Sequence, residues 1–328
     1  MTIHYVDGYK MNALGLSTLL KMGCLCIRES IDINGIKYVV NERLGEGGFS
    51  CVDLVEQTST KKKFALKRIT CHSIEDQKIA NQEIMYYKKL KHPNIIQLID
   101  ACIKGSADIV VQTTSEAYLL LPYYKRGTLH DYLTVRQSST NYLDIREVLR
   151  LFLDICEAVK YLHNYSPEAI AHRDIKVANV CLTDNMDPIL MDLGSCTTAK
   201  VQICGVQDAQ KLQDLAAERC SMTYRAPELF HVESYCVIDQ RTDIWSLGCL
   251  LYALLYFKSP YDIIYERGDS VNLAVLSGNI FFPDNTPFPQ ELHDIITFIL
   301  KVNSAERPFI EDVIDRVTNF KRQFEFAV

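Results

Sequence analysis

The order of apolar and polar positions in the first part of the chain predicts strands. Residues 38–44 are apolar enough for a strand, and residues 52–56 alternate as a returning partner strand would. Residues 64–67 predict a third strand, and residues 118–121 predict a buried strand that ends at Pro122. A glycine-rich turn separates the first two strands, so we expect a small sheet in this region.

Helical spacing follows the third strand and dominates the rest of the chain. Ser73 with Asp76 three residues later resembles a capping box, and an apolar face continues through Ile79 and Leu90. A later amphipathic helix is indicated by apolar residues at three- and four-residue spacing, which are Val148, Phe152, Ile155, Val159 and Leu162. The same spacing at Val206, Ala209, Leu212 and Ala216 predicts a helix over residues 206–219. Residues 244–257 are the most apolar run and predict a fully buried helix.

Length and composition are those of an ordinary soluble enzyme. The 328 residues suit one large or two modest domains, with 48% hydrophobic and 23% charged residues. A net charge of −6 without a long basic run argues against a nucleic-acid partner. The run 244–257 is shorter than the roughly 20 residues that a membrane helix needs.

The twelve cysteines are scattered and form no C-x-x-C pair. This spacing disfavours both a zinc site and a disulfide framework, and indicates mostly buried free thiols in a reducing compartment. Cys51 and Cys196 are expected near the nucleotide as unreactive small residues.

Four residues in one short stretch have the chemistry of phosphoryl transfer. That reaction needs an aligned hydroxyl, neutralised phosphate charge and a divalent metal on oxygen ligands. Asp174 can orient the hydroxyl, Lys176 can lie near the transferred phosphate, and Asn179 with Asp192 can hold the metal. A surface loop could contain any one of these residues, but the ordered set predicts a catalytic loop.

The glycine-rich turn over residues 44–50 is a weak signal by itself, because a structural hairpin has the same composition. Glycine permits close backbone approach to phosphates, and Lys67 on the third strand could reach the α- and β-phosphates. Glu83 on the following helix could pair with Lys67. Alone, Lys67 would be a surface lysine and Glu83 a solvated glutamate, so the prediction depends on their joint placement.

The strand that ends at Pro122 predicts the adenine end of the pocket. Proline has no N–H but keeps a carbonyl that can accept from an amino group. We therefore predict a hinge at residues 122–126, with backbone contacts at Pro122 and Tyr124 and with Leu121 at the back of the pocket.

Taken together, these motifs resemble the protein kinase family over roughly residues 38–320. The resemblance implies an α+β, bilobal fold, with a small antiparallel sheet lobe containing one main helix (38–121) and a larger, mainly helical lobe (127–320). Residues 1–37 would be an extension and residues 321–328 a short tail. Lys176, two residues after Asp174, is similar to serine/threonine kinases, and Ser221 fits the hydroxyl residue that these kinases place beside the catalytic loop.

The resemblance also assigns the site residue by residue. Asp174 and Lys176 would be catalytic, Asn179 and Asp192 would bind Mg²⁺, and proteins would be the substrates. The residues expected to bind ATP are Leu44, Gly45, Glu46, Gly47, Gly48, Phe49, Ser50, Val52, Ala65, Lys67, Glu83, Leu121, Pro122, Tyr124, Asn179 and Asp192. Two positions depart from the family pattern: Ser50 replaces the third glycine, and Leu193 replaces a phenylalanine in an apolar slot.

Longer matches narrow the resemblance to the numb-associated kinases and to their lipid-anchored branch. The matching segments are residues 44–50, 120–122, 125–129, 191–195 and 268–271. Members of that group carry an extra helix in the activation segment, in agreement with the helical spacing of residues 206–219. Autophosphorylation is expected as well.

The amino-terminal segment contains a possible lipidation signal. A protein that starts at Met22 would expose Gly23 for myristoylation, with Cys24 and Cys26 available for palmitoylation, although Ile27 replaces the favoured Ser or Thr. Both lipids would be needed, because one myristoyl chain binds membranes with a constant of only about 10⁴ M⁻¹. The expected location is the cytoplasmic face of the Golgi or another membrane. If translation starts at Met1, Gly23 cannot be myristoylated.

Other functions and modes of regulation remain open at this level. A binding-only scaffold predicts loss of Lys67, Asp174, Asn179 or Asp192, and all four are present. A small-molecule or lipid kinase is disfavoured by residues 226–228 and by the 243–248 helix start, which build a peptide-docking surface. Arg173 could pair with a phosphate on Ser195, Thr197 or Thr198, or the 206–219 helix could order the segment without phosphorylation.

Two structural contacts are also expected. Asp243, near the start of the buried helix, is well placed to accept backbone N–H groups, and Arg307 is a candidate partner for Glu228.

Overall fold

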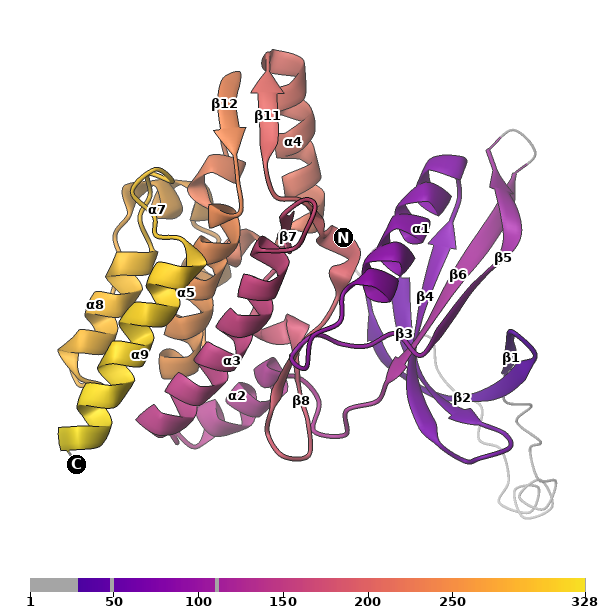
Figure 1. Cartoon of the computed structure of the whole chain (residues 1–328), viewed down its shortest axis with the longest axis horizontal. Helices are drawn as coiled ribbons and strands as arrows, with labels where there is room; N and C mark the ends of the chain where they lie inside the picture. The colour runs from indigo at the N-terminus through magenta and orange to yellow at the C-terminus, as the bar shows by residue number, and fades with distance from the viewer. Residues whose placement is uncertain (1–28, 48–49, 110–111, 328) are drawn as a thin grey trace, which may run out of the picture.

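The structure is a computed structural model that describes residues 29–47, 50–109 and 112–327. A sheet-rich lobe and a larger helical lobe lie side by side (Figure 1). This arrangement confirms the expected α+β fold. The candidate lipidation site at Gly23 lies outside the described residues.

The small lobe is built on one antiparallel sheet in the strand order β1-β2-β3-β4-β6-β5. Its strands are β1 (Ser30–Ile33), β2 (Ile36–Glu46), β3 (Ser50–Gln57), β4 (Lys63–Cys71), β5 (Asp100–Asp108) and β6 (Thr113–Pro122). The sheet starts earlier than the predicted boundary at residue 38, because β1 belongs to it. β1 has only four residues, too few for its alternation to be recognised in the sequence.

Two separate apolar layers stabilise this sheet. Helix α1 (Ile74–Lys89) covers one face, and its predicted capping box is present, with Ser73 Oγ accepting from the Asp76 N–H at 3.0 Å. Side chains alternate across a strand, so the other face carries a second cluster. Its buried members are Ile31, Ile33, Tyr38, Val55, Leu66, Tyr118 and Leu120. Two of these come from β1, which therefore closes the face opposite α1.

The large lobe is mainly helical. Its helices are α2 (Leu129–Ser138), α3 (Ile145–His163), α4 (Val206–Arg219), α5 (Arg241–Tyr256), α6 (Asp262–Glu266), α7 (Val271–Ser277), α8 (Gln290–Ile299) and α9 (Ile310–Ala327). Short strands join them: β7 (Ile170–Ala171), β8 (Val180–Leu182), β9 (Pro188–Leu190), β10 (Thr197–Thr198), β11 (Val201–Cys204) and β12 (Tyr235–Ile238). Helix α9 continues through most of the segment that was predicted to be a tail.

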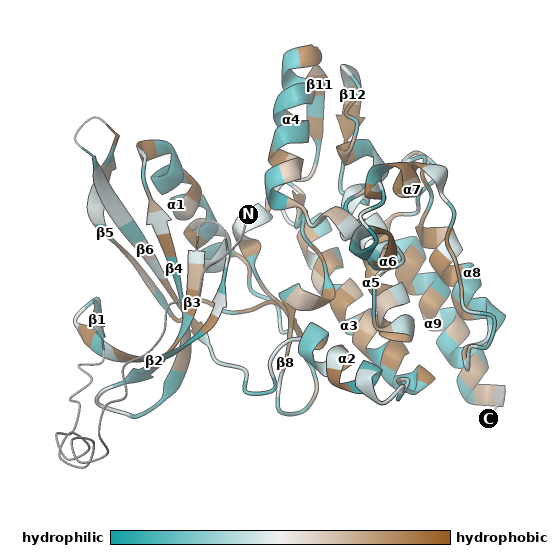
Figure 2. Ribbon diagram, turned by 180° about the vertical axis from the view of Figure 1, so that it is seen from behind, coloured by the Kyte–Doolittle hydropathy of each residue, from teal (hydrophilic) through white to brown (hydrophobic). Residues whose placement is uncertain are grey.

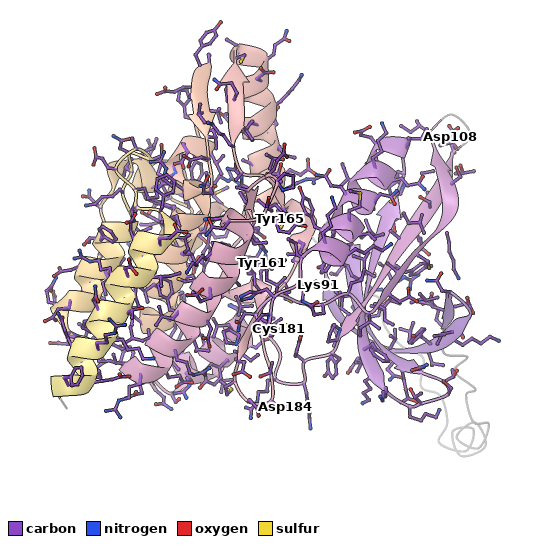
Figure 3. The ribbon with its side chains drawn as sticks, viewed as in Figure 1. Lys91, Asp108, Tyr161, Tyr165, Cys181 and Asp184 are labelled. Carbon is purple, nitrogen blue, oxygen red and sulfur yellow. The ribbon has the colours of Figure 1, made fainter. Side chains whose placement is uncertain are left out.

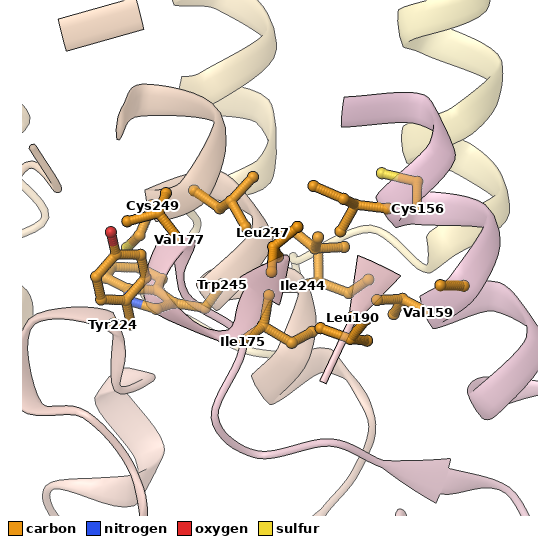
Figure 4. Packing of buried hydrophobic residues seen from close by; sticks show 14 of the residues in the cluster. Cys156, Val159, Ile175, Val177, Leu190, Tyr224, Ile244, Trp245, Leu247 and Cys249 are labelled. Atoms are coloured by element: carbon orange, nitrogen blue, oxygen red, sulfur yellow. The ribbon is translucent and has the colours of Figure 1, made fainter. Parts of the chain in front are cut away.

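Helix α5 forms the centre of this lobe, as its apolar sequence predicts. Every residue from Thr242 to Leu255 is buried, and α5 packs against α3 and α8. Ile175 and Val177, which flank Lys176, lie in the same core with Trp245 and Val159 (Figure 4). The catalytic loop is thereby anchored in the packed interior of the lobe.

The helix predicted over residues 206–219 is present with those bounds as α4. With β11 and β12 it projects from the large lobe, and Figure 2 shows that its surface is mostly hydrophilic while α5 is largely apolar. In the ranges that the structure describes, no helix is both long and apolar enough to cross a membrane.

The lobes also contact each other through the loop after α1 (Figure 3). The backbone N–H of Lys91 donates to the Tyr161 hydroxyl of α3 at 3.1 Å. The His92 ring lies against the ring of Tyr161, with 5.3 Å between their centroids. This contact fixes the end of α1 on the large lobe.

Candidate active site

Lys67 lies at the centre of an ionic cluster that joins the two lobes. Its Nζ is 2.8 Å from Glu83 Oε1 on α1 and 2.7 Å from Asp192 Oδ1 of the large lobe. The side chains of Lys67 and Glu83 are 11% and 5% exposed. The predicted Lys67–Glu83 pair is therefore present, and Asp192 is a second partner that the sequence did not indicate.

The charges in this cluster are set by burial and by mutual attraction. Burial lowers the pKa of Lys67, but the carboxylates of Glu83 and Asp192 outweigh it and hold that pKa well above its usual value. Burial raises the pKa of Asp192, yet the Lys67 ammonium group outweighs this and lowers it to about 2. The pKa of Glu83 is raised, because Lys67 offsets its burial only in part. At neutral pH, Lys67 is thus a cation and Asp192 an anion.

The turn after Asp192 fits closely under α1. Asp192 has the left-handed backbone conformation (φ 59°), and a Cβ on Gly194 would lie only 3.0 Å from Glu83 Oε2. Leu193 is fully buried, as predicted for the apolar slot, and its N–H donates to the Tyr87 hydroxyl at 3.4 Å. Glycine at position 194 is therefore what lets the Asp192 turn approach Glu83.

Helix α4 is attached to the same turn by two hydrogen bonds. The Ser195 hydroxyl donates to the carbonyl of Arg219, the last residue of α4, at 3.0 Å. The Arg219 guanidinium group donates back to the Gly194 carbonyl at 3.4 Å. The sequence predicted the helix, but not that its end holds the Asp192 turn.

The catalytic loop brings together three of the residues chosen from the sequence. Asp174 Oδ2 accepts from Asn179 Nδ2 at 2.8 Å and lies 2.9 Å from Lys176 Nζ. Asp174 Oδ1 accepts from the Ser221 N–H at 2.9 Å, and Lys176 Nζ donates to the Ser221 hydroxyl at 2.6 Å. The predicted place of Ser221 beside the loop is thus observed.

Asp243 supports this loop from below. Its two carboxylate oxygens accept from the backbone N–H groups of His172 and Arg173 at 2.7 and 2.8 Å, and His163 Nε2 lies 3.0 Å away. Burial raises the pKa of Asp243, but the hydrogen bond to His163 and the nearby cations outweigh it and lower that pKa. Asp243 does accept backbone N–H groups as predicted, although they come from the catalytic loop and not from the start of its own helix.

The sequence did not single out His163 or His172. His163 is the last residue of α3 and lies next to its apolar stripe. A histidine beside that stripe was the signal that the sequence offered. His172 Nε2 lies 3.1 Å from the Met191 carbonyl, which links the loop to the residue before Asp192. This contact joins two distant parts of the chain, so no local pattern reveals it.

Arg173 is engaged by other parts of the large lobe. Its guanidinium group donates to the Thr242 hydroxyl at 2.9 Å and to the Ala199 carbonyl at 3.1 Å. It thereby ties the catalytic loop to the segment that follows β10.

Most of the small-lobe residues predicted to contact the nucleotide lie on the neighbouring strands β2, β3, β4 and β6 of the sheet. The exposed residues of the glycine-rich turn are Leu44, Gly45, Glu46 and Gly47, and the Gly47 N–H donates to the Ser50 carbonyl at 2.7 Å. Gly48 and Phe49 lie outside the described residues. Val52 pairs with Lys67, and Ala65 pairs with Leu121. Leu121 is buried, whereas Pro122, the last residue of β6, and Tyr124 just after it are half-buried. The row Val52, Ala65 and Leu121 thus leads from Lys67 to the predicted hinge.

The donor set fits a magnesium ion that is held mainly by substrate. Asn179 uses its amide nitrogen to bond both the carbonyl and the carboxylate of Asp174, which leaves the amide oxygen as its ligand atom. Asp192 adds a carboxylate. Mg²⁺ commonly binds through one or two such side chains together with waters and phosphates. In the described ranges, no group of three or more His, Cys, Asp or Glu residues could hold a metal alone.

Two further expectations concern residues around the site. Burial raises the pKa of both the Cys51 and the Cys196 thiol, which favours the protonated form of each. Glu228 and Arg307 form the predicted ion pair through two contacts of 2.7 and 2.9 Å. The Arg307 side chain is fully buried, so this pair holds residues 226–228 on the large lobe.

Comparisons with known proteins agree with this geometry. Residues 38–317 match the model of the protein kinase domain family. The chain is 40% identical over 294 residues to serine/threonine-protein kinase 16 of Rattus norvegicus, covering 90% of this chain and 93% of that protein. For the Homo sapiens protein of the same name, the identity is 41% over 287 residues, covering 88% and 91%. A probable serine/threonine-protein kinase of Dictyostelium discoideum is 35% identical over 361 residues, covering 90% and 96%.

Proposed function

The chain belongs to the protein kinase family and is a serine/threonine protein kinase, and from this premise we propose how its residues share the reaction. Its relatives also bear out the resemblance to the numb-associated kinases. The γ-phosphoryl group of Mg-ATP is transferred to serine and threonine hydroxyls of proteins. The observation that carries this proposal is the convergence of Lys176 and Asn179 on Asp174, each within 3 Å of its carboxylate, with Lys67 bonded to Asp192.

Asp174 orients the attacking hydroxyl and takes its proton. Asn179, Lys176 and the Ser221 N–H all bond its carboxylate, so the side chain is held in one orientation before substrate arrives. Lys176 reaches both Asp174 and Ser221, so its ammonium group lies where a transferred phosphate meets the hydroxyl. Such preorganised positioning and charge stabilisation supply most of the catalysis of phosphoryl transfer.

The other half of the site binds the nucleotide. Lys67 holds the α- and β-phosphates, and Glu83 orients Lys67. Asn179 and Asp192 are the ligands for Mg²⁺, which neutralises phosphate charge when it is bound. Residues 44–50 cover the phosphates, Val52, Ala65 and Leu121 line the adenine site, and Pro122 and Tyr124 bond adenine at a hinge over residues 122–126.

The test of this function is phosphate incorporation into a generic protein panel with magnesium and ATP, with Asp174→Asn as the comparison. The variant keeps the size of the side chain and loses its basicity, so we expect a fall of about 10²–10⁴-fold in kcat. Ser138→Ala, in an exposed helix end on the large lobe, is the matched control and should keep wild-type activity. Equal incorporation by wild type and Asp174→Asn would refute the mechanism.

Autophosphorylation is part of the same proposal, and the contacts of the activation segment favour Thr197 as its acceptor. Thr197 lines a cavity of roughly 220 Å³ beside α1 together with Arg173 and Arg219, two cations that could pair with a phosphate. The Ser195 hydroxyl is bonded to the Arg219 carbonyl, and the Thr198 hydroxyl lies 3.3 Å from the Glu168 carboxylate, which would repel a phosphate. Peptide mass spectrometry after incubation with ATP should locate phosphate on Thr197 in wild type and none in Asp174→Asn. Phosphate confined to Thr198 would contradict this choice.

Membrane anchoring rests on the sequence alone. We propose that protein initiated at Met22 carries myristate on Gly23 and palmitate on Cys24 and Cys26, and that it lies on the cytoplasmic face of the Golgi or a related membrane. Mass spectrometry of the native amino terminus tests this directly. A terminal peptide that begins at Thr2, with no acylated Gly23 form, would refute it.

A further inference from the structure

The outer face of the small-lobe sheet, opposite α1, carries a chain of ion pairs centred on Asp53. Asp53 is only 1% exposed. Its Oδ1 bonds Arg43 Nε, and its Oδ2 lies 3.5 Å from Arg68 Nη1. A buried carboxylate is stable only when opposite charges compensate for lost hydration, so Arg43 and Arg68 both hold Asp53 in place.

The first branch of these ion pairs leads to the phosphate-binding turn, the glycine-rich turn over residues 44–50. Arg43 and Asp53 are cross-strand neighbours, and a bulge between Arg43 and Gly45 follows directly. Arg43 Nη1 also lies 3.5 Å from the carboxylate of Glu46, the last residue of β2. The Arg43–Asp53 pair therefore fixes the base of the turn at the point where β2 leaves regular pairing.

The second branch leads to the start of the described chain. Arg68 Nη1 bonds Glu29 at 3.0 Å, and Arg68 Nη2 bonds Glu116 at 3.3 Å. The Glu29 carbonyl also accepts from the Val40 N–H on β2 at 2.9 Å. Glu29 directly precedes β1 and is thereby attached to β2 and β4. Arg68 is only 16% exposed, and its guanidinium group lies 5.8 Å from the centre of the Tyr118 ring.

None of these side chains faces the nucleotide. Successive residues of a strand point to opposite faces, and Val52, next to Asp53, belongs to the row that leads to Lys67. Leu66, next to Lys67 and opposite Asp53, belongs to the second apolar cluster on the outer face. Any effect of Asp53 and Arg68 on ATP must therefore pass through the position of the turn.

We propose that Asp53 and Arg68 are positioning residues for the phosphate-binding turn, and that they couple it to Glu29, the residue before β1. This inference rests on the proposed role of the turn in binding ATP phosphates. Breaking the chain of ion pairs releases the base of the turn, which weakens ATP binding and leaves the chemistry at Asp174 unchanged.

The experiment compares Arg68→Gln, Arg68→Lys and Glu29→Gln in the full chain. The readouts are the KM for ATP and kcat in a protein-phosphorylation assay, and the Kd of a non-hydrolysable ATP analogue measured by titration. For Arg68→Gln, both KM and Kd should rise about three- to tenfold, with kcat within about twofold of wild type. Arg68→Lys keeps the charge and should recover part of this affinity, and Glu29→Gln should raise Kd by about twofold. Lys258→Gln breaks the Lys258–Glu266 pair of the large lobe and is the matched control.

Each result decides the inference. Wild-type values of KM and Kd in Arg68→Gln would overturn it, and so would a loss of thermal stability and kcat without a change in Kd. If Arg68→Gln does not fold, Glu29→Gln carries the test, because Glu29 is half exposed, and an unchanged Kd there overturns the coupling. Failure of wild type to bind the analogue, or full activity of Asp174→Asn, would instead refute the proposed function.

Discussion

The two halves of the site are held in place by different kinds of contact. In the small lobe, Lys67 is positioned by side-chain ion pairs to Glu83 and Asp192, which belong to separate elements. In the large lobe, the catalytic loop is positioned through its backbone, because Asp243 accepts from the N–H groups of His172 and Arg173. The ion pairs of Lys67 can be lost when α1 or the Asp192 turn moves. The buried carboxylate of Asp243, in contrast, fixes the catalytic loop within one lobe, because it is bonded to the backbone of that loop.

The two kinds of contact indicate which half of the site can be switched. The small-lobe contacts break when α1 or the Asp192 turn is displaced. Helix α4 is hydrogen-bonded to that turn through Arg219. Breaking the large-lobe contacts requires partial unfolding of the core around α5. Substitutions that break the Asp243 contacts should therefore reduce stability and activity together, and substitutions that break the Lys67 contacts should reduce mainly activity.

Asp243→Asn should have the largest effect. The amide nitrogen must face a backbone N–H or His163, so at least one acceptor becomes a donor opposite another donor. Removing one partner of a buried charged contact costs about 3–5 kcal/mol, and we expect a loss of that size in the free energy of unfolding, measured with urea. Activity should fall more than about 10²-fold as the loop shifts. Asp239→Asn, which weakens the 2.8 Å pair with Arg241, is the control and should cost much less. A variant that keeps wild-type stability but loses activity would contradict the claim that the Asp243 contacts support both.

Lys67→Met should separate activity from stability. The substitution removes the cation that holds Asp192 and the phosphates, so kcat should fall about 10²–10³-fold. Removing one partner of a buried ion pair costs about 3–5 kcal/mol when the other charge stays unpaired, but Glu83 can bind a proton, so we expect a smaller loss in the free energy of unfolding, about 1–2 kcal/mol. Steady-state kinetics and urea unfolding on the same preparation measure both quantities. A loss of stability as large as that of Asp243→Asn would remove the distinction between the lobes.

Gly194→Ala tests the fit of the Asp192 turn under α1. The new Cβ would lie 3.0 Å from Glu83 Oε2 and 3.3 Å from Asp192 Oδ1, so one of these carboxylates must move. Overpacking of this kind costs about 1–3 kcal/mol, and we expect kcat/KM to fall about tenfold. The double variant Gly194→Ala/Glu83→Asp shortens the obstructing side chain, so its loss should be smaller than the product of the single losses. If the losses in kcat/KM from the two substitutions were independent, the Cβ at position 194 would not be in steric conflict with Glu83.

Local patterns predicted the parts of the fold that depend on local physics. The capping box at Ser73, the α4 helix and the apolar α5 are each encoded by neighbouring residues, and each is present. The Lys67–Glu83 and Glu228–Arg307 pairs could be predicted because each partner lies in a recognisable motif. Strand β1 was missed because four residues carry too little periodicity.

The support of the site could not be predicted in the same way. Asp243 bonds a loop some 70 residues earlier in the chain, and Asp53 forms an ion pair with Arg68 across neighbouring strands. Such contacts depend on how elements pack, and one sequence does not fix which polar residue of an element faces inward. His163 illustrates this, because helical spacing places it beside the apolar stripe and only packing shows that Asp243 is its partner.

The smallest effect concerns acid stability. The lowered pKa of Asp192, about 2, means that its charge stabilises the folded state above the unfolded pKa of about 3.9, and that this contribution is lost as pH falls toward 2. The raised pKa of Glu83 acts in the opposite direction and favours the folded state at low pH. Since the Asp192 side chain is 44% exposed, solvent screening reduces its share to about 1 kcal/mol.

Lys67→Met isolates this contribution, because without the ammonium group the pKa of Asp192 rises and burial raises that of Glu83 further. The free energy of unfolding should therefore fall less between pH 5 and pH 3 in Lys67→Met than in wild type, by about 1 kcal/mol. Lys258→Met removes a lysine of the large lobe and should behave as wild type. Identical acid sensitivity in Lys67→Met and wild type would mean that the lysine does not set the charge of Asp192, and the ionic cluster would then not be what holds the small-lobe half of the site.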